Sequence, residues 1–391
     1  MIVMKENLIS RRANSVGRTK IRKMFELEKT LDNVISFTVG EPDFHTPEHI
    51  VRACERALAE HKTGYAPNQG VLELREAVAE RTLKTHGVKY DPETEILITA
   101  GGMNALRAAS EALVNQGDEV IVPDPYWCNH FHHPLMELGV AVAVPVDAAS
   151  NYMYDVARLE GYITEKTKTI ILNSPSNPTG RVMDRATMKK LCELCIKHDL
   201  ILISDEVYEH IIYDDTEFVS PVMFDGMRER TILCNSFSKS YAMTGWRIGY
   251  AVGPADIINA MLRINENTLA SPTTFAQYAA VEALRGPQDD VKKMVSSFEK
   301  RRDILLEGIN KIPKLSCPKL QGAFYAFVDI RGTGLSDDEF CERLLLEKRV
   351  SVTPGSGFGA NGAGHVRMSY ALSEDDLREG LLRIGEFIET L

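Results

Sequence analysis

The sequence lacks features that define whole classes of protein. No apolar run approaches the length of about 18 residues that a membrane-spanning helix requires. The N-terminal segment MIVMKENLISRRANS has basic residues but no apolar core like that of a secretory signal. Basic residues form no cluster long enough to follow a phosphate backbone, and the net charge is −10. We therefore expect neither a membrane nor a nucleic acid as a partner.

Cysteine offers no framework for disulfides or metal. The seven cysteines are an odd number, lie scattered and mostly fall within apolar patterns, which indicates reduced thiols in a cytoplasmic protein. The CELC segment (192–195) has a metal-site spacing but lies on a helical apolar stripe. The HFHH segment (130–133) lacks partner cysteines or acids, although His130 is a candidate for lining a site. No metal is expected.

The middle of the chain alternates short apolar runs with helical patterns. Most of the runs are continuously apolar, as expected of strands covered on both faces. Helical spacing between them, for example after a capping Asp184, predicts an α/β domain with a mostly parallel sheet. The seven predicted strands are 95–100, 119–123, 141–146, 169–173, 200–204, 231–235 and 247–252.

A second domain is expected because 391 residues exceed the size at which one core keeps growing. Long charged amphipathic helices follow residue 285, then strand-like runs and a last helix from Ser373. We predict a large domain over 48–285 and a smaller α+β domain from 1–47 and 286–391.

Polar side chains follow three of the predicted strands. SPSNPTG (174–180) presents Asn177, DEVYEH presents Asp205 and Tyr208, and SFSKSYAMTGWRIGY (236–250) presents Lys239. In open α/β sheets, ligands bind beyond the carboxyl ends of the strands. We therefore expect an amide, a carboxylate, a phenol and a lysine at one edge of the sheet.

The same edge has the groups that suit a phosphate. TAGGMNAL (99–106) is predicted as a strand, a glycine turn and a helix start, so the amides of Gly102 and Met103 can face an anion. Ser236, Ser238 and Arg247 add hydroxyl and guanidinium donors.

This set of groups predicts one cofactor. A partly desolvated lysine is a nucleophile for an aldehyde and forms a Schiff base. A buried carboxylate suits a cationic ring nitrogen, and a phenol with an amide suits a ring oxygen. Together with the phosphate donors, these groups describe a site for pyridoxal 5'-phosphate.

The motifs SPSNPTG, SDEVY, SFSKSYAMTGWRIGY and HVRMSYA, in this order and spacing, resemble those of class I aminotransferases. These are fold-type I pyridoxal-phosphate enzymes, and the similarity is to the subgroup of bacterial aspartate and aromatic aminotransferases. It extends from VGEPDF (39–44) to the last helix. The resemblance implies a homodimer that moves the amino group of an L-amino acid, aspartate or aromatic, to a 2-oxo acid such as 2-oxoglutarate by a ping-pong mechanism.

The resemblance also implies roles for individual residues. Lys239 would bind the cofactor covalently and then move the substrate α-proton, and Asp205 would pair with the ring nitrogen. Arg367 would bind the substrate α-carboxylate as a planar fork, and Tyr65 would reach the phosphate in the neighbouring subunit. The other implied contacts are Tyr208 and Asn177 on the ring oxygen, Trp127 stacked on the ring, Gly102, Met103, Ser236, Ser238 and Arg247 on the phosphate, and Asn177 with the Gly40 backbone beside the carboxylate.

Each residue alone has a simpler interpretation. A lysine after a strand is usually solvated, and Asp205 could cap a helix. Trp127 could belong to the core, and Arg367 could form a surface ion pair.

Two other functions use similar sequences. A pyridoxal-phosphate β-lyase would bind the cofactor with the same residues. A transcription regulator with an aminotransferase-like sensor domain would need an N-terminal DNA-binding domain, and the first 47 residues have no helix-turn-helix pattern.

Two regions of the sequence bear on substrate specificity. Some relatives that act on acidic substrates place a basic residue on the helix after the glycine turn, where this chain has Ser110 and Glu111. That difference disfavours strict aspartate specificity, whereas Arg18 or Arg22 could supply a positive charge.

Overall fold

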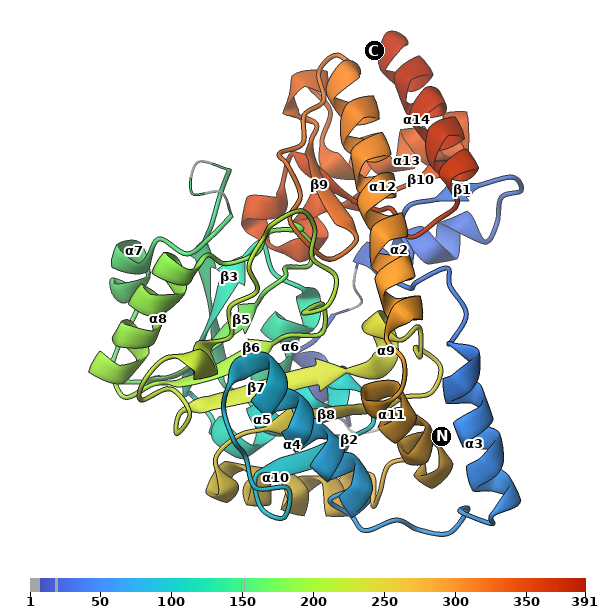
Figure 1. Cartoon of the computed structure of the whole chain (residues 1–391). Helices are drawn as coiled ribbons and strands as arrows, with labels where there is room; N and C mark the ends of the chain where they lie inside the picture. Colours follow the sequence, from blue (N-terminus) through green and yellow to red (C-terminus); the bar gives the residue numbers. More distant parts are fainter. Residues whose placement is uncertain (1–7, 18–19, 149, 151) are drawn as a thin grey trace, which may run out of the picture.

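The computed structural model describes residues 8–17, 20–148, 150 and 152–391, without the side chains of 21–23. Its centre is a seven-stranded sheet of order β2-β8-β7-β6-β5-β3-β4 (Figure 1). All neighbouring strands are parallel except those that pair with β8, which is antiparallel to β2 and β7. The strands are β2 (Ile96–Thr99), β3 (Glu119–Asp124), β4 (Val140–Pro145), β5 (Thr167–Asn173), β6 (Ile201–Asp205), β7 (Thr231–Ser236) and β8 (Gly249–Val252). The predicted fold class is therefore confirmed.

Helices cover both faces of this sheet because its strands are apolar on both. Successive residues of a strand point to opposite faces, so Ile203 and Ile232 pack on one side while Leu202 and Leu233 pack on the other. Burying each such side chain contributes roughly 1.5–3 kcal/mol. The first side is covered by α5 (Gly102–Leu113), α6 (Cys128–Met136) and α10 (Ala255–Thr268), and the second by α3 (Glu48–Ala59), α4 (Leu72–His86), α7 (Val156–Glu160), α8 (Arg185–Lys197) and α11 (Thr274–Arg285).

A second layer of strands lies beside the first (Figure 1). β9 (Tyr325–Asp329), β11 (Thr353–Pro354) and β12 (His365–Ser369) form an antiparallel sheet of order β11-β12-β9, and β1 (Ile35–Ser36) pairs with β10 (Val350–Ser351). They share one core with the C-terminal helices. The remaining helices are α1 (Arg11–Asn14), α2 (Lys20–Glu28), α9 (Phe237–Ser240), α12 (Asp289–Lys311), α13 (Asp337–Lys348) and α14 (Glu374–Glu389), with 3-10 turns η1 (Pro221–Met223), η2 (Arg331–Thr333), η3 (Gly355–Phe358) and η4 (Ala360–Gly362).

Several sequence signals act locally as expected. Asp184 accepts hydrogen bonds from the amides of Ala186 and Thr187 at the start of α8, and Ser373 caps α14. The domain boundaries at 47/48 and 285/286 stay a prediction.

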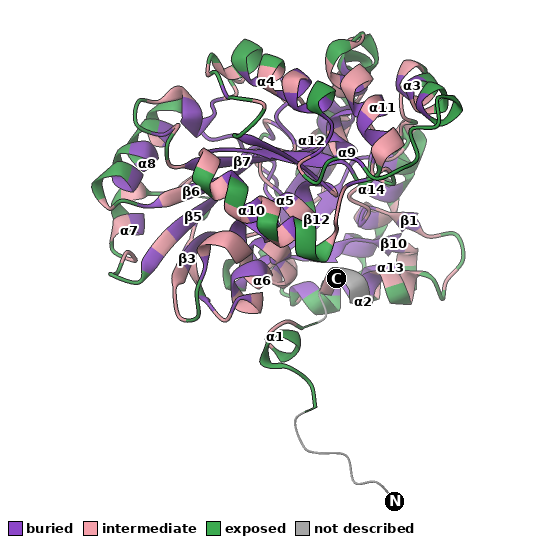
Figure 2. Cartoon of the chain, turned by 90° about the horizontal axis from the view of Figure 1, so that it is seen from below, coloured by how far each residue is buried: buried purple, intermediate pink, exposed green. Residues whose placement is uncertain are grey.

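The distribution of buried residues follows this layering. The sheet strands are buried, whereas exposed residues lie on the outward faces of helices such as α4 and α8 (Figure 2). Within the part of the chain that the structure describes, no helix is both long and apolar enough to cross a membrane.

Candidate active site

A pocket of about 430 Å³ opens at the carboxyl ends of β5, β6 and β7. Tyr325 and Arg367, from β9 and β12, complete its wall, so both layers of strands contribute to it. Twelve of the predicted site residues line this pocket: Gly40, Gly102, Met103, Trp127, Asn177, Asp205, Tyr208, Ser236, Ser238, Lys239, Arg247 and Arg367. The structure thus brings together side chains up to 327 positions apart in the chain, and leaves out Tyr65 alone.

Lys239 lies on α9, the single helical turn that begins directly after β7. Ser236 starts this turn by accepting a hydrogen bond from the amide of Ser238. The Lys239 ammonium donates to the carbonyl of Gly40. Burial disfavours the charged form and lowers the pKa of Lys239 to about 8. The amine is therefore neutral more easily than that of a solvated lysine.

Asp205 ends β6 and is only 3% exposed. Its Oδ2 lies 2.8 Å from Nε2 of His130, and its Oδ1 accepts a hydrogen bond of 3.3 Å from the amide of Val207. The latter bond stabilises a turn, because no helix follows β6 at this point, so the helix-cap interpretation of Asp205 is wrong. A buried carboxylate that His130 holds in place suits a cationic partner in the pocket.

The phosphate-binding prediction rests on a compact set of donors. Nη1 of Arg247 lies 3.4 Å from Oγ of Ser238, which in turn lies 2.9 Å from Oγ of Ser236. Gly101 adopts φ +83°, and a Cβ there would lie 2.5 Å from Nη2 of Arg247. Because α5 begins at Gly102, its first amides face the same space. Hydroxyls, a guanidinium and a helix N-terminus form a donor set that fits a phosphate.

Tyr208 and Asn177 are the two residues predicted to bind the ring oxygen, and both line the pocket. The Tyr208 hydroxyl lies 3.0 Å from that of Tyr325, and burial raises the pKa of Tyr208 well above the ordinary phenol value, so it stays a proton donor. The backbone N–H of Asn177 donates to Oδ1 of Asn173 at 2.8 Å, which fixes the turn that carries the Asn177 side chain.

Arg367 is buried on β12, with 3% of its surface exposed, so the surface ion-pair interpretation is wrong. Its Nη1 donates to Oδ1 of Asn177 at 3.2 Å and its Nη2 to the carbonyl of Thr38 at 2.7 Å. The guanidinium lies between two rings, 4.6 Å from the centre of Tyr325 and 4.9 Å from that of Phe358. Its Nε has no hydrogen-bond partner among the described residues. The remaining N–H groups are suited to an incoming carboxylate.

Trp127 is half-buried at the start of α6 and lines the pocket. Its ring contacts His130 edge-to-face, with centroids 5.2 Å apart. Trp127 therefore is not simply a core residue, and it borders the same space as Asp205.

Other predicted residues lie elsewhere. Tyr65 is 94% exposed in the single chain. Glu111 pairs with Arg107 on α5 at 3.4 Å, and neither Glu111 nor the buried Ser110 lines the pocket. Arg18 and the side chain of Arg22 lie outside the described residues.

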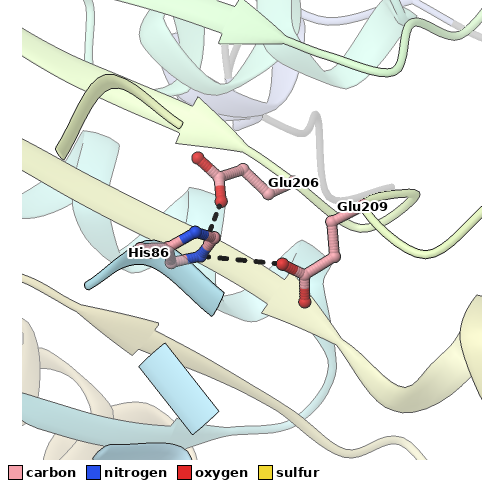
Figure 3. A group of neighbouring side chains, drawn as sticks. All are labelled: His86, Glu206 and Glu209. Atoms are coloured by element: carbon pink, nitrogen blue, oxygen red, sulfur yellow. Dashed lines mark ion pairs between the residues drawn. The ribbon is translucent and has the colours of Figure 1, made fainter. Parts of the chain in front are cut away.

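A second buried cluster of titratable groups lies beside the site. Nε2 of His86 is 3.6 Å from Glu206 and 3.7 Å from Glu209 (Figure 3). Burial and the Glu209 charge raise the pKa of Glu206 to about 8, so this carboxyl holds a proton at neutral pH. Burial also acts on Glu209, but the Arg81 guanidinium, 3.2 Å away, brings its pKa down to about 2. Because Arg81 already neutralises Glu209, the cluster balances its charge without a metal ion.

Sequence reasoning did not identify every group that lines the pocket. Tyr325 and Thr38 contact predicted residues, and Phe25 of α2 closes one side. His130 was expected only as lining, not as the partner of Asp205. The sequence does contain a signal for Tyr325. This residue lies two positions from Phe327 in an apolar strand, so both side chains lie on the same strand face, and Phe327 pairs with Arg367.

The chain closely resembles known proteins over almost its whole length. A family model described as "Aminotransferase class I and II" matches residues 32–384. The probable aspartate/prephenate aminotransferase of Aquifex aeolicus is 43% identical, over 99% of this chain and all of that protein. The solved aromatic aminotransferase of Pyrococcus horikoshii has a TM-score of 0.90 at 40% identity, over 95% of this chain and 99% of that one. The aspartate aminotransferase of Thermus thermophilus with maleate has a TM-score of 0.93 at 39% identity, over 99% and 100%.

Proposed function

The chain belongs to the class I and II aminotransferases and is a pyridoxal-phosphate-dependent enzyme, and from this premise we propose which groups it moves and how. It transfers the amino group of an L-amino acid, aromatic or aspartate, to 2-oxoglutarate by a ping-pong mechanism. One observation carries this proposal: a half-buried lysine of lowered pKa lines the same pocket as a buried arginine whose Nε has no hydrogen-bond partner among the described residues. The β-lyase alternative is not favoured, since the relatives named for an activity are aminotransferases.

The residues present fit pyridoxal 5'-phosphate. When bound, this cofactor supplies an aldehyde that takes up the amino group and a ring that withdraws electrons from the substrate α-carbon. Ser236, Ser238, Arg247 and the start of α5 would hold its phosphate. Asp205 would keep the ring nitrogen protonated, while Trp127, Tyr208 and Asn177 would orient the ring.

Lys239 and Arg367 have different roles toward the substrate. Arg367 binds the α-carboxylate with its planar fork, which fixes the orientation of the α-carbon. Nζ of Lys239 would then move the α-proton between the substrate α-carbon and the cofactor. Its pKa of about 8 suits this task, because a proton carrier works best when its pKa lies near the operating pH.

Substitution of Arg367 by lysine should weaken the binding of amino acids and of 2-oxo acids to a similar extent. A point charge cannot replace the fork or its contacts to Asn177 and Thr38. Loss of a charged hydrogen bond of about 1.5–3 kcal/mol predicts a fall of roughly 10- to 150-fold in kcat/KM. Both half-reactions should be measured, with Arg343→Lys on the surface of α13 as control. An unchanged kcat/KM in either half-reaction would remove Arg367 from the site.

The lining of the pocket favours an aromatic donor over aspartate. Phe25, Val39, Met103 and Leu106 are apolar. Among the described lining residues, the cations are Lys239, Arg247 and Arg367, which already have roles. A side-chain carboxylate, whether of an aspartate donor or of 2-oxoglutarate, therefore meets no further cation from these residues. The acceptor is held by its α-carboxylate on Arg367, whereas the aromatic ring of a donor meets apolar surface.

The donor preference can be tested at Met103, which lines the pocket from α5 and is 39% exposed. Met103→Lys should raise kcat/KM for aspartate relative to phenylalanine by roughly 10-fold, because it adds a cation within reach of the donor side chain. Met103→Gln has a similar shape without charge and should leave the ratio near that of the unchanged protein. The idea is refuted if both variants shift the ratio equally, or if the unchanged protein already prefers aspartate.

We also propose a cytoplasmic homodimer with shared active sites, which would explain why Tyr65 is exposed in the single chain. If Tyr65 binds the cofactor in its partner subunit, we can combine one Tyr65→Ala chain and one Lys239→Ala chain in a dimer. Both substitutions then lie in the same active site, and the other active site is intact. Random re-association of the two weak homodimers should then restore roughly a quarter of the normal activity, because half of the dimers are mixed and each has one good site of two.

The control for this experiment is subunit exchange itself, verified with chains that carry different tags. Activity no greater than the sum of the separate mutants, despite verified exchange, would mean that Tyr65 does not act across the interface.

A further inference from the structure

Tyr325 has a position in the pocket that the proposed mechanism does not use. In the β9–β12 ladder, Tyr325 pairs with Ser369 and Phe327 pairs with Arg367. Paired residues of an antiparallel ladder share a face, and so do residues two apart in one strand. Tyr325 and Arg367 are therefore diagonal neighbours on the same face, and this face lines the pocket.

The Tyr325 side chain contacts the substrate side and the cofactor side at once. Its ring lies 4.6 Å from the Arg367 guanidinium, while its hydroxyl lies 3.0 Å from that of Tyr208. The two tyrosine rings meet edge-to-face, with centroids 5.8 Å apart. A Cβ on Gly40 would lie 2.6 Å from the Tyr325 hydroxyl, so this hydroxyl also borders the loop residue whose carbonyl accepts the Lys239 hydrogen bond.

Tyr325 is held rigidly in this place. It is 1% exposed, and its ring also packs against Phe324, with centroids 4.8 Å apart. A side chain so fixed can hold its neighbours in one geometry, because buried rings have few alternative rotamers in a closely packed core.

We propose that Tyr325 is a positioning residue that aligns Tyr208 with the cofactor ring oxygen through its hydroxyl and holds Arg367 for the substrate carboxylate through its ring. A phenol has a single proton to donate. If Tyr325 donates to Tyr208, the proton of Tyr208 is free for the ring oxygen. The ring face meanwhile stabilises the guanidinium by a cation–π contact in a desolvated place.

This inference rests on the proposed function, and two substitutions separate its parts. Tyr325→Phe removes the hydroxyl and retains the ring, whereas Tyr325→Leu removes both. Tyr370→Phe is the matched control, because it removes a buried hydroxyl that lies 3.3 Å from that of Tyr213, away from the pocket.

Two measurements on the holoenzymes need no turnover. One is the pH midpoint at which the absorbance of the bound cofactor changes. The other is the dissociation constant of 3-phenylpropionate, an unreactive carboxylate. Tyr325→Phe should move the midpoint up by about half a pH unit, because a Tyr208 hydroxyl that is less well oriented stabilises the negative ring oxygen less. It should lower kcat while leaving the dissociation constant within about twofold, since the cation–π contact remains.

Tyr325→Leu should in addition raise the dissociation constant of 3-phenylpropionate by about 3- to 30-fold, because the cation–π contact is lost. Tyr370→Phe should change neither quantity. The proposal is overturned if Tyr325→Phe leaves the midpoint unchanged, or if Tyr325→Leu binds the carboxylate as tightly as Tyr325→Phe. Failure of the proposed function would look different, because the unchanged protein would then not convert amino donors at all.

Discussion

Replacement of Lys239 by alanine is expected to lower the rate of amino transfer by about 10⁴-fold, the upper end of what a positioned proton-transfer group contributes. The variant should still bind pyridoxal phosphate, because the phosphate and ring contacts do not involve Lys239. Steady-state activity and bound cofactor per chain are the two measurements. Lys189→Ala, which removes an exposed lysine on α8, is the control and should behave like the unchanged protein.

The lowered pKa of Lys239 adds a second readout. Only the neutral amine attacks an aldehyde, so covalent uptake of the cofactor by apoprotein should accelerate as pH rises and level off above about 8. A lysine with an ordinary pKa would instead keep accelerating to about pH 10. Borohydride reduction followed by peptide mass spectrometry should place the cofactor on Lys239. Substantial activity in Lys239→Ala, or a label on another lysine, would show that the assignment is wrong.

Replacement of Asp205 by alanine should reduce kcat/KM far more than cofactor occupancy. Without the buried carboxylate, the ring nitrogen loses its proton and with it the electron-withdrawing capacity on which the chemistry depends. Truncation of one partner of a buried charge pair costs about 2–5 kcal/mol, which corresponds to a fall of about 30- to 5,000-fold. Rates with saturating cofactor separate this loss from weaker binding.

The matched variant is Asp205→Asn, which retains the shape of the side chain but not its charge. It should be nearly as slow as Asp205→Ala, since the charge holds the proton and a neutral amide does not. If both variants keep the rate of the unchanged protein, Asp205 has no electrostatic role. If only the alanine variant is slow, Asp205 acts by packing against His130 and not by charge.

The sequence predicted the sheet well because its strands are short, apolar runs that end in polar motifs. All seven predicted strands of the central sheet are present within a few residues, and the predicted strand ends deliver Asn177, Asp205 and Lys239 to one pocket. Local patterns suffice here because parallel strands bring their carboxyl ends to the same edge.

Contacts between distant segments were not predictable in this way. Two contacts depend on how the two layers of strands pack. They are the hydrogen bond between the Tyr208 and Tyr325 hydroxyls and the one from Arg367 to the carbonyl of Thr38. The hydrogen bond of His130 to Asp205 depends on where α6 places its buried face. The spacing of residues along the chain does not predict which of these distant residues meet. The family resemblance implied the roles of the site residues but not these supporting contacts.

A single-turnover experiment tests the central claim most directly. The holoenzyme is mixed with L-phenylalanine without any 2-oxo acid, and the cofactor spectrum, the 2-oxo acid and free ammonia are measured. We predict one 2-oxo acid per active site, conversion of the cofactor to its amine form and no ammonia. Addition of 2-oxoglutarate should then restore the original spectrum and yield one glutamate per site. Continuous release of ammonia without an acceptor, or no spectral change with any amino acid tried, would contradict the account.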